Sequence, residues 1–180
     1  MLGPGSLPRP VRYDCSMANT AQTSTFARFM ARTLASGIGS GYLRPAPGTW
    51  GSAAALALLV AWQPAPAVLS GAFCFSVPVA YWAIAQVQSG ADAQSDPGWI
   101  VVDEWQGLAL GWLLATPASP IGYTLLFCLF RLFDARKLGP IRAADASLEG
   151  PWGVMVDDWL AGIAAGLVTR MVLVLVAHGI

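Results

Sequence analysis

The chain has 180 residues, which is enough for one domain with a sizeable core. Hydrophobic residues make up 56% of it and charged residues only 11%, whereas about a quarter of an ordinary globular protein is charged. This composition is typical of a membrane protein with several helices. The ten basic and ten acidic residues cancel, so charge gives no sign of a nucleic-acid partner. The three cysteines, odd in number and far apart, support neither a disulfide framework nor a zinc site.

The N-terminal region divides into a tail and a short helix. Residues 1–25 are rich in Pro, Gly, Ser and Thr and lack the apolar core of a signal peptide, which predicts a disordered tail before a single domain over 26–180. Residues 26–36 place apolar side chains at helical spacing, with Arg28 and Arg32 on the other face. This pattern fits an interfacial helix on an anionic membrane surface, and it equally fits an amphipathic helix packed on a core.

The next stretch, "GIGSGYLRPAPGTWGS", cannot be helical throughout, because it is rich in Gly and Pro. Thr49 or Ser52 could cap the helix that follows. Gly39, Gly41, Gly48 and Gly51 would let backbone N–H groups approach an anion, and the start of the next helix would add the positive end of its dipole. A plain turn explains the same residues without an anion.

The rest of the chain predicts an all-α fold, a compact multi-helix bundle with membrane-embedded hydrophobic helices joined in part by the Gly/Pro-rich loop. The expected helices are the apolar segments 50–63, 66–88, 105–116, 121–133 and 159–177. Spanning a bilayer takes about 20 apolar residues, so only 66–88 and 159–177 qualify. If the first four segments form two hairpins, three loops emerge on the same side: 37–52, 89–104 and 134–158. Basic residues lie there too, namely Arg44, Arg136, Lys137 and Arg142, which predicts that this side is cytoplasmic.

Two acid pairs stand out in this weakly charged chain. "VVDEWQG" contains Asp103 and Glu104, and "VMVDDWLAG" contains Asp157 and Asp158. A carboxylate next to hydrocarbon is costly unless it meets a cation, a metal or a polar cavity. Helix capping by the first acid of each pair is the alternative interpretation. It does not explain why both positions are doubled.

Each acid pair is followed by a glycine, Gly107 or Gly162, at which another helix or backbone could approach closely. Between the pairs lies "FRLFDARKLGPIR", in which Arg131, Asp134 and Lys137 share one helix face. This face could be a solvated salt-bridge ladder. It could also form the mouth of a site, because the segment before it is strongly apolar.

Oxygen ligands without nearby His or Cys favour magnesium, which takes one or two carboxylates together with water and phosphate oxygens. Arg131, Lys137 and Arg142 could neutralise a phosphate. Carboxylates, a divalent cation and basic side chains are the usual components of phosphoryl chemistry.

Four motifs in this order, "GSGYLRPAPGTWGS", "IVVDEWQG", "FRLFDARKLGPIR" and "GVMVDDWLAG", resemble those of the bacterial phosphatidylglycerophosphatase A family. The resemblance covers about residues 36–168 of the chain. It implies an all-helical, magnesium-dependent phosphatase of the bacterial inner membrane. Such an enzyme removes the terminal phosphate of phosphatidylglycerophosphate at the cytoplasmic face and leaves phosphatidylglycerol.

Carried over position by position, the resemblance assigns five acids to catalysis and to the metal: Asp103, Glu104, Asp134, Asp157 and Asp158. Its basic partners are Arg131 and Lys137. With Arg142 and the loop residues considered above, the residues expected to hold the substrate phosphate are Arg131, Lys137, Arg142, Gly39, Gly41, Thr49 and Ser52. One position departs from the family pattern, because Leu138 stands where a proline usually follows the lysine.

The sequence leaves the reaction route open between direct attack by water and an aspartyl-phosphate intermediate. A membrane transporter or channel that binds a cation through clustered carboxylates is the main alternative function. Against it, the acids gather at segment ends on one predicted side. A phosphatidyltransferase would carry a D-G-x-x-A-R signature, which is absent. The oligomeric state is not predicted.

Overall fold

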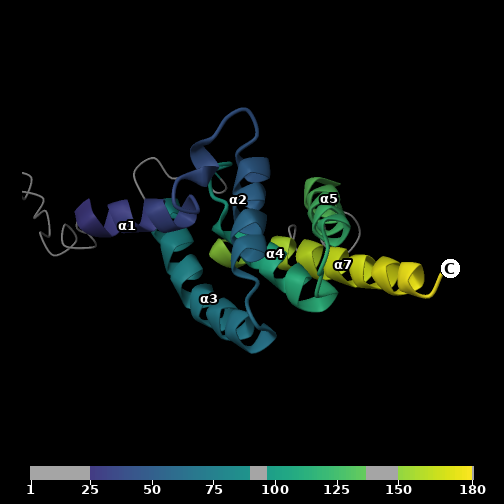
Figure 1. Ribbon diagram of the computed structural model, residues 1–180. Coiled ribbons are helices and arrows are strands. Elements are labelled where there is room, and N and C mark those ends of the chain that lie inside the picture. Colours follow the sequence, from purple (N-terminus) through teal and green to yellow (C-terminus); the bar gives the residue numbers. More distant parts are fainter. Residues whose placement is uncertain (1–24, 90–96, 137–149, 180) are drawn as a thin grey trace, which may run out of the picture.

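The computed structural model describes residues 25–89, 97–136 and 150–179. Over these ranges it contains α-helices and one short 3-10 helix, and no strand. The elements are α1 (Thr25–Ala35), η2 (Ser40–Tyr42), α2 (Pro47–Trp62), α3 (Pro66–Gln88), α4 (Val102–Ala115), α5 (Pro120–Arg136) and α7 (Pro151–Ala177). Figure 1 shows them as a bundle. The predicted all-α class is confirmed; the tail expected over residues 1–25 lies almost wholly outside the described residues.

Proline begins four of these helices and fixes where they start. Pro47, Pro66 and Pro151 occupy the first turns of α2, α3 and α7, and Pro120 is the first residue of α5. Proline suits this position because its missing N–H would have no partner inside the helix. The predicted segment 66–88 matches α3, but α7 begins at Pro151, well before the expected residue 159. The apolar pattern did not predict the first two turns of α7, which contain Pro, Gly and two acids.

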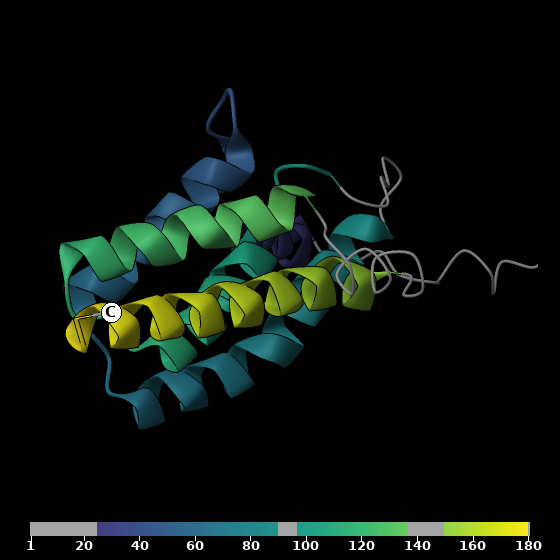
Figure 2. The ribbon, with the colours of Figure 1, turned by 90° about the vertical axis from the view of Figure 1, so that its right-hand side faces the viewer.

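The helices bring distant parts of the sequence to one end of the bundle. In Figure 2, α3, α5 and α7 run across the view, and the last turns of α3 and α5 lie at the same end as the first turns of α7. Side-chain contacts place the starts of α2 and α4 there as well, because Ser52, Glu104 and Arg131 are hydrogen-bonded to one another. The described parts of the three predicted loops therefore meet, as the hairpin pairing requires. We call this the site end of the bundle.

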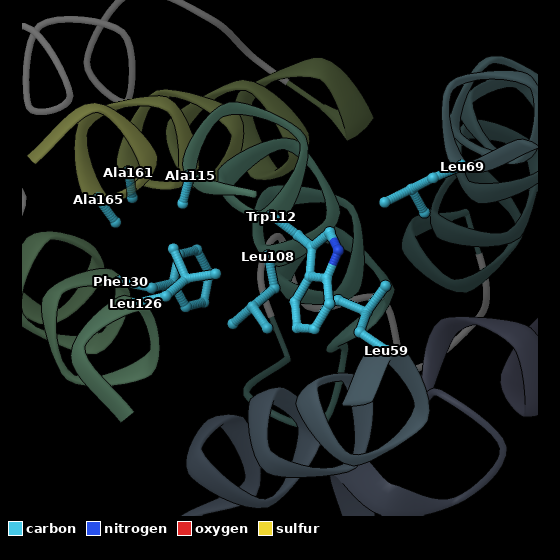
Figure 3. Close-up of a cluster of buried hydrophobic side chains, with 9 residues drawn as sticks. All are labelled: Leu59, Leu69, Leu108, Trp112, Ala115, Leu126, Phe130, Ala161 and Ala165. Carbon is cyan, nitrogen blue, oxygen red and sulfur yellow. The ribbon is translucent and has the colours of Figure 1, made fainter. Parts of the chain in front are cut away.

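Two apolar clusters hold the helices together. The larger lies between α2, α4, α5 and α7, and Figure 3 shows Phe130 and Leu126 of α5 facing Ala161 and Ala165 of α7, with Leu108 of α4 beside them. The smaller joins α1 to α3. Burying side chains of this kind stabilises the fold by about 1.5–3 kcal/mol for each large one.

Much of the surface of the two longest helices remains outside these clusters. α3 and α7 have 23 and 27 residues, and each is apolar enough to cross a membrane. Only 22% and 28% of their apolar windows are buried inside the molecule, so they differ from the core helices of a soluble protein. An exposed apolar surface of this extent fits contact with lipid.

Helix α1 has features of both predicted alternatives, an interfacial helix and a helix packed on the core. Ala31 and Ala35 are buried against Ala80 and Ala83 of α3, so one side of the helix packs on the bundle. The aromatic side chain of Phe29 stays 65% exposed. The helix is therefore neither wholly buried nor detached from the fold.

Candidate functional site

The two acid pairs meet because α4 and α7 cross at contact distance. Both helices carry glycines four residues apart, Gly107 and Gly111 on α4 and Gly162 and Gly166 on α7. A Cβ added to Gly162 would overlap the backbone carbonyl of Gly107, and one added to Gly107 would stand 2.5 Å from the carbonyl oxygen of Asp158. Small residues at this spacing are the usual way for helices in membranes to approach closely. The prediction of a close approach at Gly107 and Gly162 is confirmed.

The spacing along each helix then places the acids. Glu104 precedes Gly107 by one turn, and Asp158 precedes Gly162 by one turn, so both pairs lie beside the crossing on the side of the site end. All four carboxylate residues are buried, with between 5% and 8% of their surface exposed. A buried charge of this kind requires compensation.

Helix capping does not account for both pairs. Asp103 and Glu104 lie in the first turn of α4, but Asp157 and Asp158 lie in the second turn of α7, whose first turn has no acid. The two pairs nevertheless share one local feature. The first acid of each accepts a hydrogen bond from the backbone N–H of the second, at 3.0 Å in α4 and 3.1 Å in α7. This bond restrains Oδ1 of Asp103 and of Asp157.

Arg131 supplies the positive charge that this cluster needs. Its Nη1 lies 2.9 Å from Oε1 of Glu104 and 2.6 Å from Oδ2 of Asp134, one turn further along α5. The predicted Arg131–Asp134 pairing on one helix face is therefore confirmed. Because Arg131 also reaches Glu104 on another helix, it does more than form a solvated ladder. Its side chain keeps 23% of its surface exposed, so the guanidinium lies at the boundary between the buried acids and the outside.

The start of α2 forms the neighbouring wall of the site. The Ser52 hydroxyl is 2.8 Å from the carbonyl oxygen of Gly48 and 2.9 Å from Oε2 of Glu104, and it donates its single proton to one of them at a time. It also accepts a bond from Nη1 of Arg131 at 3.3 Å. Ser52 is therefore part of the cluster. Its predicted role as a helix cap is wrong, because α2 begins at Pro47 with Ala46 as its N-cap and no side-chain capping bond.

The loop glycine that reaches the site is Gly48, one of the four glycines at which the sequence predicts a close approach of backbone, although it is not among the residues assigned to the phosphate. A Cβ on Gly48 would overlap Oε1 of Glu104 and stand 3.1 Å from Nη2 of Arg131. Only glycine lets the first turn of α2 lie this close to the ion pair. The signal in the sequence is the missing side chain of glycine, which lets backbone approach other groups closely.

The other predicted phosphate ligands lie elsewhere or are not described. Gly41 is buried against the backbone of Trp99 and the side chain of Val101, so it supports the segment that leads into α4. Gly39 has a left-handed backbone with φ of 91°, and Thr49 is exposed on α2. Lys137 and Arg142 lie outside the described residues. Within the described part of the chain, the structure brings Arg131 and Ser52 to the carboxylates.

The electrostatics of the site are dominated by burial of like charges. Burial raises the pKa of Glu104 to about 7, although Arg131 and the hydrogen bond from Ser52 act in the opposite direction. Asp158 lies within electrostatic range of Asp103, Asp134 and Glu104. Among the described residues, Arg131 is the cation that forms ion pairs with these acids. An additional cation would relieve their repulsion.

The donor set suits a hard divalent cation such as magnesium, because every candidate ligand is an oxygen. Over residues 25–89, 97–136 and 150–179, no three carboxylate, imidazole or thiol side chains already converge on one point. Magnesium does not need such a cage, since it is often held by one or two carboxylates together with waters and phosphate oxygens. The residues therefore fit magnesium as a cation shared with a phosphate.

The fold and this cluster together define a class, namely helical proteins with two helices that could span a membrane and a buried polar site at one end of the bundle. Comparison with known proteins identifies the family within that class. The family model for phosphatidylglycerophosphatase A matches residues 33–173, so the chain belongs to the phosphatidylglycerophosphatase A family.

Individual relatives agree with this assignment. The chain is similar to phosphatidylglycerophosphatase A of Haemophilus influenzae, with 39% identity over 140 residues that cover 75% of this chain and 83% of the relative. It is 35% identical to phosphatidylglycerophosphatase A of Escherichia coli over 142 residues, 74% of this chain and 78% of the relative.

A third relative carries a different name. The chain is 32% identical over 149 residues to a putative phosphatidylinositol-3-phosphatase of Bacteroides thetaiotaomicron, covering 75% of this chain and 88% of the relative. No solved structure gives a significant match.

Proposed function

We propose that the protein hydrolyses the terminal phosphate monoester of phosphatidylglycerophosphate with the help of magnesium. Water and the phospholipid give phosphatidylglycerol and inorganic phosphate. The observation that supports this most is the partly buried ion-pair cluster that Arg131 forms with Glu104 and Asp134 beside the other paired acids. The family assignment and the names of two relatives support the same reaction.

The residues divide into two groups by charge. Carboxylates of the two acid pairs and of Asp134 would hold the magnesium ion. When bound, magnesium supplies a positive charge that polarises the phosphate and favours deprotonation of water. Arg131 would bind phosphate oxygens, with Lys137, Arg142 and the N–H groups of Gly48 and Thr49 at the start of α2 as further donors.

A carboxylate that does not touch the cation would accept the proton from the attacking water. Oδ1 of Asp103 and Oδ1 of Asp157 already accept backbone hydrogen bonds, and both oxygens of Glu104 are engaged by Arg131 and Ser52. Asp158 is therefore the favoured candidate for this role. The same acids also allow an aspartyl-phosphate intermediate. Acid quenching during turnover of substrate that carries ³²P in its terminal phosphate distinguishes the two routes, because only the aspartyl-phosphate route leaves label covalently attached to the protein.

We further propose a multi-pass protein of the bacterial inner membrane with its site at the cytoplasmic side. The support is the distribution of basic residues and the two helices that can cross a membrane. Arg32 and Arg44 are exposed on elements that lead into the site end, and Arg136 ends α5 there. Positive residues favour the cytoplasmic side of a membrane.

The direct test is release of inorganic phosphate from phosphatidylglycerophosphate by the purified full chain in detergent micelles. Activity should appear with magnesium, disappear with EDTA and return when magnesium is added in excess. Release that ignores EDTA would remove the metal from the proposal. A complete lack of release in micelles and in bilayers would favour the cation transporter, which ion flux into proteoliposomes would then examine.

The range of lipid substrates needs a matched comparison. Phosphatidylinositol 3-phosphate tests the activity that the name of the Bacteroides relative indicates, and phosphatidic acid tests a smaller headgroup. We expect phosphatidylglycerophosphate to give the highest kcat/KM. A higher value for another lipid would replace the substrate while leaving the reaction type in place.

A further inference from the structure

A hydrogen bond joins the two acid-bearing helices immediately beyond their acid pairs. Trp159, which follows Asp158, donates from Nε1 to Oε1 of Gln106 at 3.1 Å. Gln106 lies two residues after Glu104 and is only 3% exposed. Neither residue belongs to the set that sequence reasoning assigned to catalysis or to phosphate binding.

Both ends of the Gln106 amide are satisfied. An indole N–H can only donate, so the amide oxygen must face Trp159 and the amide nitrogen must face the other way. There Nε2 donates to Oγ of Ser76 on α3 at 2.9 Å, and Ser76 donates to the carbonyl oxygen of Phe73 at 2.8 Å. One partly buried chain of hydrogen bonds thus connects α7, α4 and α3.

The ring of Trp159 is also held by its neighbours. It packs edge-to-face on Phe73 of α3, with ring centroids 5.5 Å apart, and on Trp152 at 6.2 Å. Such contacts fix the plane of the indole. The bond to Gln106 therefore has a defined direction as well as a defined length.

This bond supplies what the glycine crossing lacks. Gly107 and Gly162 set how closely α4 and α7 approach, but they have no side chains that interlock and resist rotation of α7 about its own axis. Adjacent residues on a helix point about 100° apart, so a modest rotation would change which carboxylate of a pair faces the site. A directional bond beside each acid pair opposes such a rotation.

We propose that Gln106 and Trp159 are a positioning pair that fixes the rotation of α7 against α4 and so sets which carboxylates can share a cation. The inference rests on the proposed function, because it assumes that the acid pairs bind a divalent cation. Ser76 would extend the restraint to α3.

The chemistry of a buried hydrogen bond separates positioning from plain structural support. Removing one partner leaves the other buried and unsatisfied, which destabilises the fold, whereas replacing both by apolar groups is close to neutral for stability. Trp159→Phe should therefore lower the thermal unfolding midpoint, and the double variant Gln106→Leu with Trp159→Phe should recover most of that loss. A positioning role predicts that cation affinity stays weak in the double variant, because the directional bond is still absent.

The experiment uses the full chain in detergent micelles, with Mn²⁺ as a paramagnetic substitute for magnesium. The EPR signal of free Mn²⁺ gives the Kd without any need for activity, and thermal unfolding in EDTA gives the stability of the same samples. Trp62→Phe is the control, because Trp62 is an exposed indole on α2. We expect Trp159→Phe and the double variant to weaken Mn²⁺ binding by about tenfold, as residues behind metal ligands commonly do, and the control to leave it unchanged.

Each result then has one meaning. Affinity that recovers together with stability in the double variant would overturn the positioning role and leave a structural one. Unchanged affinity in Trp159→Phe would overturn the inference while the proposed function stands. Absence of Mn²⁺ binding in the unsubstituted protein would overturn both the cation site and the inference.

Discussion

The two ends of the bundle differ in how their polar side chains are buried and paired. At the far end, where α2 and α4 finish and α5 starts, polar groups pair one to one: Arg170 donates to Oγ1 of Thr116 at 2.7 Å, and Gln63 donates to the Tyr123 hydroxyl at 3.0 Å. These residues are exposed or partly exposed. At the site end the acids are buried, and they outnumber the cation that the described residues place among them.

The difference shows which polar cluster lowers the stability of the fold. Exposed pairs such as Arg170 with Thr116 keep contact with water or headgroups and contribute little. The buried acids of the site end repel one another and weaken the fold unless a ligand compensates them. Such a loss of stability is expected at a functional site. We therefore place the catalytic site at the site end and not at the far end. The two ends provide matched pairs of variants.

The largest contrast should come from the acids themselves. Asp103→Asn and Asp157→Asn, made separately, should each lower phosphate release by about a thousandfold, because they remove charge that binds and orients the cation. The amide is nearly the same size, so the variants should fold, which thermal unfolding in detergent will check. Near-normal activity in both variants would contradict a metal site shared by the two pairs.

The next contrast compares the two arginines. Arg131→Ala should lower kcat/KM by about a hundredfold or more, since it removes the phosphate donor and leaves Glu104 and Asp134 without their partner. Arg170→Ala, on the same scale, should change activity by less than about threefold, because its bond to Thr116 is exposed. Equal losses of kcat/KM in the two variants would contradict the assignment of catalysis to the site end alone.

A third comparison tests the crossing that brings the acid pairs together. Gly162→Ala should lower the free energy of unfolding by about 3 kcal/mol, because the new methyl group would overlap the Gly107 carbonyl and force the helices apart. Gly71→Ala is the control. No atom outside its own helix lies within 4 Å of the added Cβ, so helix propensity alone should raise stability by up to about 1 kcal/mol. Thermal unfolding of both variants in the same detergent gives the comparison.

The smallest effect concerns the wall formed by α2. Ser52→Ala should lower activity by about tenfold, because Glu104 loses one hydrogen bond while its ion pair with Arg131 remains. Thr49→Ala, one turn earlier and exposed, should stay within about twofold. A larger effect at Thr49 than at Ser52 would indicate that the hydroxyl exposed at the helix start is the one that meets the substrate.

Sequence patterns predicted the parts of this molecule that depend on local order. The helical class, the bounds of α3, the two acid pairs and the close approach at Gly107 and Gly162 all follow from spacing along the chain. Ser52 shows where such reasoning fails. A serine near a helix start favours capping, but its hydroxyl is engaged by Glu104, which lies far away in sequence and is brought close only by tertiary packing.

Sequence patterns did not predict the start of α7 or the Gln106–Trp159 hydrogen bond, and the reasons are related. Residues 151–158 contain Pro, Gly and two acids, so hydrophobic periodicity alone favours a loop there, whereas burial of Gly153 and Met155 makes the turns helical. Gln106 and Trp159 are ordinary residues of apolar segments until their partners are known. Their placement depends on the rotation of two helices, which local patterns do not encode.

The place of Asp158 within α7 has a consequence for how a lipid would be handled. From Asp158 to Ala177 the helix rises by about 28 Å, close to the roughly 30 Å thickness of the hydrocarbon layer of a bilayer. If the rest of α7 lies in that layer, with the side chain of Arg170 reaching toward its far surface, the carboxylates stand at the depth of the headgroups. A phospholipid could then present its phosphate while its acyl chains stay among their neighbours, so turnover would require sideways diffusion in the membrane plane and no extraction of the lipid into water.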